Sequence, residues 1–171
     1  MDRSRNESRA MRSQPEWRRP TYFAGFEQSL TVQPRVRPGF RVLVAGDDPA
    51  FANDVRELVA CMGATVLLVP DGAQAVALAR GNNVDLVLMD LHMPVLDGLR
   101  ATMQIRQHER EDLCARVAVV AYTSNSVDSR LMRDCGIDAV LDKSCTEESL
   151  FECVARWCDP RVAEHIGSYR I

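Results

Sequence analysis

The sequence predicts an α/β domain built around a parallel five-stranded sheet. Short apolar runs alternate, between residues 41 and 158, with segments whose apolar residues recur at helical spacing. The runs are continuously apolar, as in strands covered on both faces, and alternation with helices is typical of parallel sheets. A chain of 171 residues has room for one ordinary domain, which holds about 100–150 residues.

Each predicted element has a local signal. The strands are predicted at the apolar runs Val42–Ala45, Val66–Val69, Val84–Met89, Val117–Ala121 and Ala139–Leu141. The helices are predicted where apolar residues recur three or four positions apart, at Phe51–Met62, Ala73–Arg80, Leu99–His108, Asp128–Cys135 and from Thr146 through Trp157. Glycine, which ends many helices, follows three of them at Gly63, Gly81 and Gly136.

Charge separates the N-terminal arm from the rest of the chain. Residues 1–40 hold eight arginines and four acids, whereas residues 41–171 hold 13 basic and 20 acidic residues. We expect a disordered or linker-like arm at 1–39, a domain at 40–158 and a tail at 159–171. The acidic domain argues against nucleic acid as the main partner, and no DNA-binding module follows residue 158.

Membrane and zinc-binding classes are not favoured. No apolar run approaches the roughly 20 residues that a membrane-spanning helix needs, and the arginine-rich start lacks the apolar stretch of a secretory signal. We therefore expect a cytoplasmic protein with no membrane segment in this chain. The six cysteines are scattered without a CxxC pair, which predicts ordinary thiols.

Polar residues follow four of the predicted strands. Asp47 and Asp48 come after the first strand, Asp90 after the third, Thr123 after the fourth and Lys143 after the fifth. Ligands of open α/β sheets bind at the carboxyl ends of the strands, so we expect these side chains on one rim. Clustered carboxylates need a compensating cation, and oxygen ligands suit Mg²⁺. One carboxylate could then act as a nucleophile toward phosphorus.

Lys143 is the one lysine in a chain with 20 arginines. An ammonium is a compact point charge and a guanidinium is a planar fork, so the two differ at a tight site. The exception favours a site that requires a point charge, although chance retention is an equal alternative.

Two segments carry a family resemblance. Met89–Gly98, with the sequence MDLHMPVLDG, and Ala121–Asn125, with the sequence AYTSN, resemble the receiver domains of two-component response regulators and hybrid histidine kinases. The spacing from Asp47 through Asp90 to Lys143 is similar as well, and the resemblance covers about residues 41–158. It implies a flavodoxin-like (βα)5 receiver with strand order 2-1-3-4-5.

The resemblance also implies an activity and its residues. Asp90 would accept a phosphoryl group from a histidine kinase or a histidine phosphotransfer protein, and Thr123 and Lys143 would contact the phosphoryl oxygens. The chain would catalyse at most its own phosphorylation and dephosphorylation. Output would be protein–protein contact or onward phosphotransfer. A second copy of the chain, forming a homodimer, is a further possible partner.

The implied cofactor is Mg²⁺. Its ligands from the chain would be Asp47, Asp90 and the backbone carbonyl of His92, and Asp48 is a further candidate. The His92 side chain lies two residues past the acceptor, where receivers influence dephosphorylation. The alternative for this side chain is an ordinary loop histidine.

Three positions depart from the family pattern. Gly46 stands where an acid usually pairs with Asp47, Ser144 replaces the proline that usually follows the lysine in a cis bond, and Val140 occupies the place of a rotating aromatic. A cis bond before a non-proline residue costs about 2.5–4 kcal/mol, which leaves a trans, rearranged loop or a strained one. The departures keep open a pseudo-receiver, a constitutive interaction module. An aspartyl-intermediate phosphatase is disfavoured because His92 stands where such enzymes carry a second aspartate.

Overall fold

The structure is a computed structural model that describes residues 39–81, 84–124 and 128–158. The predicted arm at 1–39, apart from Gly39, and the predicted tail at 159–171 lie outside the described residues. Their boundaries stay predictions. No helix among the described residues is long and apolar enough to cross a membrane.

Five parallel strands form one sheet in the described part of the chain, in the order β2-β1-β3-β4-β5. This order is the one implied by the family resemblance. The strands are β1 (Arg41–Ala45), β2 (Thr65–Val69), β3 (Leu86–Asp90), β4 (Ala118–Thr123) and β5 (Ala139–Asp142). The inner strands β1, β3 and β4 are almost wholly buried, whereas the edge strands β2 and β5 are partly exposed.

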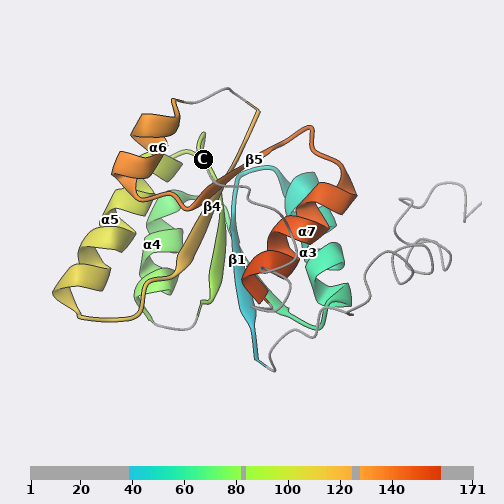
Figure 1. Cartoon of the computed structure of the whole chain (residues 1–171), viewed down its shortest axis with the longest axis horizontal. Helices are drawn as coiled ribbons and strands as arrows, with labels where there is room; N and C mark the ends of the chain where they lie inside the picture. The colour runs from blue at the N-terminus through green and yellow to red at the C-terminus, as the bar shows by residue number, and fades with distance from the viewer. Residues whose placement is uncertain (1–38, 82–83, 125–127, 159–171) are drawn as a thin grey trace, which may run out of the picture. The chain divides into compact units, whose positions relative to one another are not determined.

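Within the described residues, five helices cover the two faces of the sheet. They are α3 (Pro49–Cys61), α4 (Gly72–Arg80), α5 (Gly98–Glu111), α6 (Ser129–Cys135) and α7 (Glu147–Cys158). Helices α4, α5 and α6 lie together on one face, and α3 and α7 lie on the other (Figure 1). The covering on both faces explains why the inner strands are continuously apolar.

Several predicted boundaries were wrong by two or three residues. Helix α5 continues to Glu111 instead of ending at His108, because no glycine or proline follows His108 and the added residues are polar. Strand β3 begins at Leu86 instead of Val84, although Val84 still packs on the core. Strand β4 runs on to Thr123, so Thr123 is the last residue of its strand, as Asp90 is of β3.

Helices α4 and α5 begin at polar side chains that satisfy free backbone N–H groups. Asp71 accepts from the Gln74 backbone N at 2.9 Å and from the Gln74 side chain at 2.7 Å, and these bonds hold the pKa of Asp71 below its usual value. Asp97 caps α5 by accepting from the Arg100 backbone N at 2.9 Å. Both caps fix where the following helix leaves the rim of the sheet.

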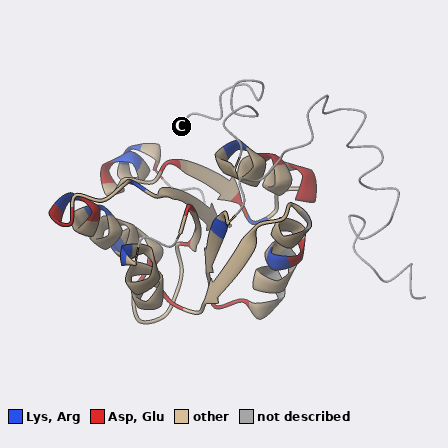
Figure 2. Cartoon of the chain, turned by 90° about the horizontal axis from the view of Figure 1, so that it is seen from below, with Lys and Arg blue, Asp and Glu red and all other residues tan. Residues whose placement is uncertain are grey.

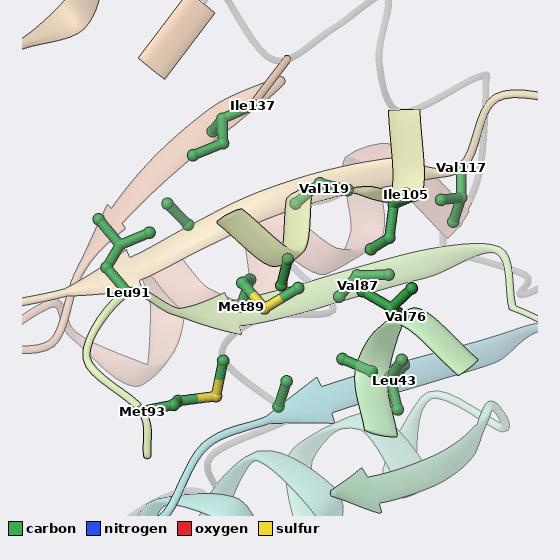
Figure 3. Packing of buried hydrophobic residues seen from close by; sticks show 14 of the residues in the cluster. Leu43, Val76, Val87, Met89, Leu91, Met93, Ile105, Val117, Val119 and Ile137 are labelled. Carbon is green, nitrogen blue, oxygen red and sulfur yellow. The ribbon is translucent and has the colours of Figure 1, made fainter. Parts of the chain in front are cut away.

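The main core lies between the sheet and the α4–α6 layer (Figure 3). Leu43, Val87 and Val119 project from three adjacent strands and are fully buried. Val76 of α4 and Ile105 of α5 close the layer from the helix side. Each such side chain contributes roughly 1.5–3 kcal/mol when it is fully buried, so this layer is a main source of stability.

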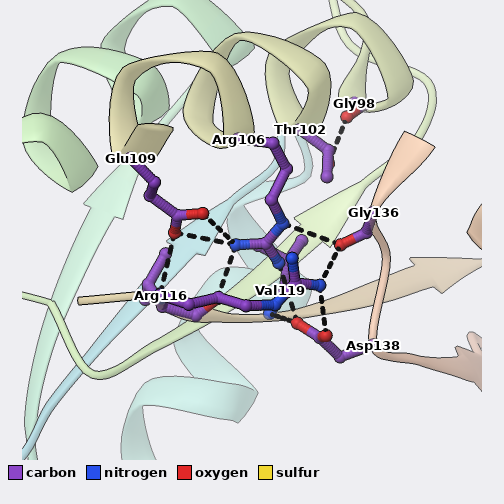
Figure 4. A network of polar contacts seen from close by, with 9 residues as sticks. Gly98, Thr102, Arg106, Glu109, Arg116, Val119, Gly136 and Asp138 are labelled. Atoms are coloured by element: carbon purple, nitrogen blue, oxygen red, sulfur yellow. Dashed lines mark hydrogen bonds and ion pairs between the residues drawn. The ribbon is translucent and has the colours of Figure 1, made fainter. Parts of the chain in front are cut away.

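A buried arginine joins α5 to the starts of β4 and β5 (Figure 4). Arg106 is 4% exposed. Its guanidinium donates to both oxygens of Glu109 at 2.8 and 2.9 Å, to the Val117 carbonyl at 2.8 Å and to Asp138 Oδ2 at 2.8 Å. Its Nε donates to the Gly136 carbonyl at 2.9 Å. The contacts compensate the buried charge and hold the ends of three elements together.

Gly136 is required beside this arginine. It ends α6 in the left-handed conformation, at φ 89°, and a Cβ atom there would lie 2.7 Å from Arg106 Cγ. Any other residue would meet both a backbone penalty and a clash. The glycine that the sequence marks as a helix end therefore also makes room for the buried arginine.

Charges of both signs are distributed over the helices. Figure 2 shows blue and red segments on the helices at both sides of the sheet. In that view each helix layer carries charges of both signs.

Candidate functional site

Asp90 lies at the carboxyl end of β3, in the middle of the sheet. The residue is 2% exposed, and β4 places Tyr122 beside it in register. One carboxylate oxygen, Oδ1, accepts from the His92 backbone N at 3.0 Å, and the other, Oδ2, forms an ion pair with Lys143 Nζ. Each oxygen of this buried carboxylate therefore has a donor.

Lys143 reaches Asp90 from the end of β5, two strands away. Its backbone N donates to the Thr123 carbonyl at 3.0 Å, which continues the β4–β5 pairing by one residue. Its Nζ lies 5.9 Å from the centre of the Tyr122 ring, and the Tyr122 hydroxyl donates to the Lys143 carbonyl at 3.1 Å. The side chain is 30% exposed, so the ammonium group sits at the edge of the site where it can meet an incoming anion.

The chain turns directly after Lys143. Asp142 Oδ1 accepts from the Ser144 backbone N at 2.7 Å and from the Ser144 hydroxyl at 2.5 Å, and the Cys145 N donates to the Asp142 carbonyl at 3.0 Å. The hydroxyl and then the backbone bond lower the pKa of Asp142. The Lys143–Ser144 peptide bond is trans, as are all peptide bonds among the described residues, so of the two predicted forms the loop takes the trans one.

Thr123 shares the rim with Asp90 and Lys143. It is 2% exposed and lies opposite Asp142 in the β4–β5 register. The structure thus brings the three predicted catalytic residues to one end of the sheet. Val140, at the position of the family's rotating aromatic, lies on β5 with 40% of its surface exposed.

Gly46, Asp47 and Asp48 follow β1 on the same rim. The Gly46 N donates to the Val69 carbonyl at 3.0 Å, and a Cβ atom at Gly46 would lie 3.7 Å from Asp90 Cβ and 4.0 Å from Asp90 Oδ2. Position 46 therefore adjoins the Asp90 carboxylate directly. Asp47 and Asp48 are exposed, and the Asp48 carbonyl accepts from Ala52 N at 3.1 Å as α3 begins.

The donor set fits Mg²⁺ at a site with few carboxylates. Within residues 39–81, 84–124 and 128–158, no three His, Cys, Asp or Glu side chains gather as a metal cluster. Mg²⁺ is often held by one or two carboxylates together with waters and substrate phosphates. The predicted ligands, Asp47, Asp90 and the His92 carbonyl, would supply two carboxylates, and position 46, which adjoins Asp90, is a glycine and not an acid. The His92 side chain is exposed, and its role stays open.

The protein-family model of the response regulator receiver domain matches residues 42–155 of this chain. The chain belongs to this family. The family match confirms the predicted resemblance to receiver domains, and the sheet order confirms the flavodoxin-like receiver fold.

Individual receivers agree with this membership. The sensor protein GacS of Pseudomonas syringae pv. syringae is 37% identical over 119 residues, which are 68% of this chain and 13% of GacS. The receiver domain of sensor histidine kinase PA1611 from Pseudomonas aeruginosa, solved with magnesium in its active-site cleft, is 32% identical with a TM-score of 0.60, covering 70% of this chain and 98% of that one. Chemotaxis protein CheY4 of Vibrio cholerae, 21% identical with a TM-score of 0.61 over 68% of this chain and 97% of CheY4, shares the fold.

Reasoning from the sequence did not give Tyr122 a role. It lay just after the predicted strand Val117–Ala121, inside the AYTSN segment that carries the family resemblance. The available signal was a polar aromatic at the last position before Thr123, in a strand whose other residues from Ala118 are small or aliphatic. A buried tyrosine hydroxyl usually has a partner, and here that partner is the lysine loop.

Proposed function

We propose that this receiver domain is the phosphoacceptor of a two-component phosphorelay and takes a phosphoryl group on Asp90 with Mg²⁺. The observation that carries the proposal is the buried Asp90 carboxylate ion-paired with Lys143, the one lysine of the chain, at the carboxyl end of the sheet. The use of lysine at this position, in a chain whose other 20 basic residues are arginines, supports a requirement for a compact cation.

The chemistry follows from the groups around Asp90. A carboxylate oxygen of Asp90 attacks the phosphorus of a phosphohistidine, the P–O bond forms, and the P–N bond breaks with the electron pair leaving on the imidazole. Lys143 then exchanges its carboxylate partner for a phosphoryl oxygen, and the Thr123 hydroxyl donates to another. Mg²⁺, held by Asp47, Asp90 and the His92 carbonyl, would offset the negative charge that gathers on the phosphoryl group.

The partner class follows from the same chemistry. A histidine kinase or a histidine phosphotransfer protein supplies the phosphohistidine, and output is protein–protein contact or onward phosphotransfer. The matches to GacS and to sensor histidine kinase PA1611 support this class. Because the match spans only 13% of GacS, the activity of the whole sensor protein is not carried over to this chain. A homodimer and a cytoplasmic location stay predictions.

Intact mass after incubation with Mg²⁺ and acetyl phosphate tests the acceptor. We expect the protein to gain one phosphoryl group and Asp90→Asn to gain none, because an amide cannot attack phosphorus. Asp134→Asn is the matched control, since Asp134 is an exposed acid on α6, and it should gain the group as the wild type does. A gain in Asp90→Asn equal to that of the wild type would place the acceptor elsewhere.

The second candidate function is a pseudo-receiver that binds a partner without phosphorylation. Gly46, which leaves the rim with few acids, is the observation that favours it. A folded wild-type protein that gains no phosphate at saturating Mg²⁺, and binds no beryllofluoride, would establish this alternative.

A further inference from the structure

We propose that Tyr122 is a positioning residue for phosphoryl transfer, which holds Lys143 in place from the neighbouring strand. The inference deepens the proposed function and rests on it. No role for this position followed from the family resemblance, whose implied residues were Asp90, Thr123, Lys143 and the metal ligands.

The sheet puts Tyr122 between the acceptor and the lysine loop. In the β3–β4 register it lies opposite Asp90, and in the β4–β5 register it lies opposite Leu141. Lys143 follows Leu141 by two residues, and its backbone N pairs with the Thr123 carbonyl. Tyr122 is 6% exposed, so its ring is fixed by its surroundings and can act as a rigid support.

Tyr122 contacts the lysine at two points. Its hydroxyl donates to the Lys143 carbonyl at 3.1 Å, which fixes the backbone from which the side chain departs. Its ring centre lies 5.9 Å from Lys143 Nζ, within the distance at which an ammonium is attracted to an aromatic face. A lysine side chain has many rotamers, so restraint at both its base and its tip favours the one that meets Asp90.

Among the described residues, the loop that carries Lys143 has few other contacts that restrain the lysine itself. The bond after Lys143 leads to Ser144 and is trans, and the turn that follows is held through Asp142 and Cys145. Those bonds fix the chain on either side of Lys143 but do not contact its carbonyl or its ammonium group. The two Tyr122 contacts supply restraint at both of those places.

The single lysine makes the proposal directly measurable. In the full chain labelled with ¹⁵N-lysine, Lys143 gives one backbone amide signal and one Nζ signal. Tyr122→Phe removes the hydroxyl and keeps the ring, so we expect the amide signal to move and the Nζ signal to stay near its wild-type position. Tyr122→Leu removes both contacts, so we expect both signals to move and the Nζ protons to exchange faster with water.

Phosphorylation rates should follow the same order. At saturating Mg²⁺ and acetyl phosphate, we expect the rate to fall roughly threefold to tenfold in Tyr122→Phe and by more than tenfold in Tyr122→Leu, because small misplacements of a catalytic group are costly. The Mg²⁺ concentration for half-maximal rate should be unchanged, since Tyr122 is not among the proposed metal ligands.

Val120→Ala controls for loss of stability. Val120 is fully buried on the same strand, two residues before Tyr122, and lies opposite Ala139, outside the lysine loop. It should lower the melting temperature but leave the Lys143 Nζ signal and the rate unchanged well below that temperature. Wild-type lysine signals and rates in both Tyr122 variants would overturn the inference.

The lysine signals also separate this inference from the proposed function. They are read in the unphosphorylated protein, where Tyr122 and Lys143 are in contact. In one outcome, the wild type takes no phosphate but the lysine signals move as expected in the Tyr122 variants. The proposed function then fails. Tyr122 would support the lysine loop only, and its proposed role in phosphoryl transfer would be overturned.

Discussion

Gly46 is the residue at which this site departs most directly from the family pattern. The position adjoins the acceptor, because a Cβ atom there would lie in ordinary van der Waals contact with Asp90. Gly46 is not among the described glycines with positive φ, which are Gly39, Gly63 and Gly136, so the backbone accepts a side chain without strain. The missing acid is therefore a chemical difference and not a consequence of crowding.

Gly46→Asp should bind Mg²⁺ more tightly than the wild type. A second acid beside Asp47 can hold a metal-bound water through a charge-assisted bond, so we expect the Kd from calorimetric titration to fall roughly tenfold. Without Mg²⁺ the added charge lies beside Asp90 and should lower the melting temperature, and the gain on adding Mg²⁺ should be correspondingly larger.

Two variants complete this test. Gly46→Asn adds a side chain of the same shape without the charge, so it should leave the Kd close to that of the wild type. Asp48→Ala tests whether Asp48 already supplies the missing acid. An equal Kd for wild type and Gly46→Asp, together with weaker binding by Asp48→Ala, would show that Asp48 takes this role.

At the residue scale, sequence reasoning found the residues whose position along a strand is enough to place them. Asp90, Thr123 and Lys143 each stand at a strand end, and parallel strands bring those ends to one rim. The roles of Tyr122 and Arg106 were missed because they depend on contacts with residues far away in the sequence. Tyr122 contacts the neighbouring strand's loop, and Arg106 on α5 contacts the starts of β4 and β5. Apolar periodicity contains no such information, and a buried arginine reads in the sequence as an exposed helix residue.

At the scale of elements, the Arg106 network holds the end of the sheet opposite Asp90, the proposed phosphoacceptor. Glu109 also accepts from the Val117 N, and Asp138 also accepts from the Val119 N, each at 2.8 Å. Arg106 thus compensates two carboxylates that are themselves tied to the strand β4. Removing it would leave Glu109, 11% exposed, without this cation, and Asp138, 18% exposed, paired with Arg116 alone.

Arg106→Met should destabilise the domain by about 3–5 kcal/mol, because removing one partner of a buried ion pair leaves uncompensated charge. Urea unfolding measures this change. Arg110→Met is the matched control on the exposed face of the same helix and should change the free energy of unfolding by less than about 0.5 kcal/mol.

Phosphorylation of Arg106→Met well below its melting temperature should proceed at the wild-type rate, since the network touches no residue of the proposed site. A reduced rate in a folded variant would mean that the network reaches the acceptor through β4. A loss of stability no larger than that of Arg110→Met would show that the buried pairs contribute little.

At the scale of the molecule, the sequence predicted the five strands and five helices but not how the helices divide between the faces. The apolar runs distinguish inner from edge strands only weakly. Leu67 and Leu68 of β2 are as apolar as the residues of β1, although β2 lies at the edge of the sheet. The strand order came from the family resemblance and is confirmed. The division of helices, with α7 beside α3, depends on the handedness of the crossovers and not on any local pattern.

The predicted domain boundaries lead to a test on the whole chain. Both boundary residues, Phe40 and Cys158, are buried, at 4% and 3% exposed, and all described strands and helices lie between them. The fragment 40–158 therefore contains the described core and the proposed site. We expect it to fold with the melting temperature of the full chain and to take phosphate from acetyl phosphate at the same rate.

The position of the boundary itself can be checked at Phe40. Its carbonyl accepts from the Thr65 N at 2.9 Å, which ties it to the start of β2, and its ring is part of the core. Phe40→Ala in the fragment should cost about 3–5 kcal/mol, because it leaves a cavity under the sheet. If the fragment melts several degrees below the full chain while Phe40→Ala costs little, residues outside 40–158 stabilise the fold and the boundary is wrong.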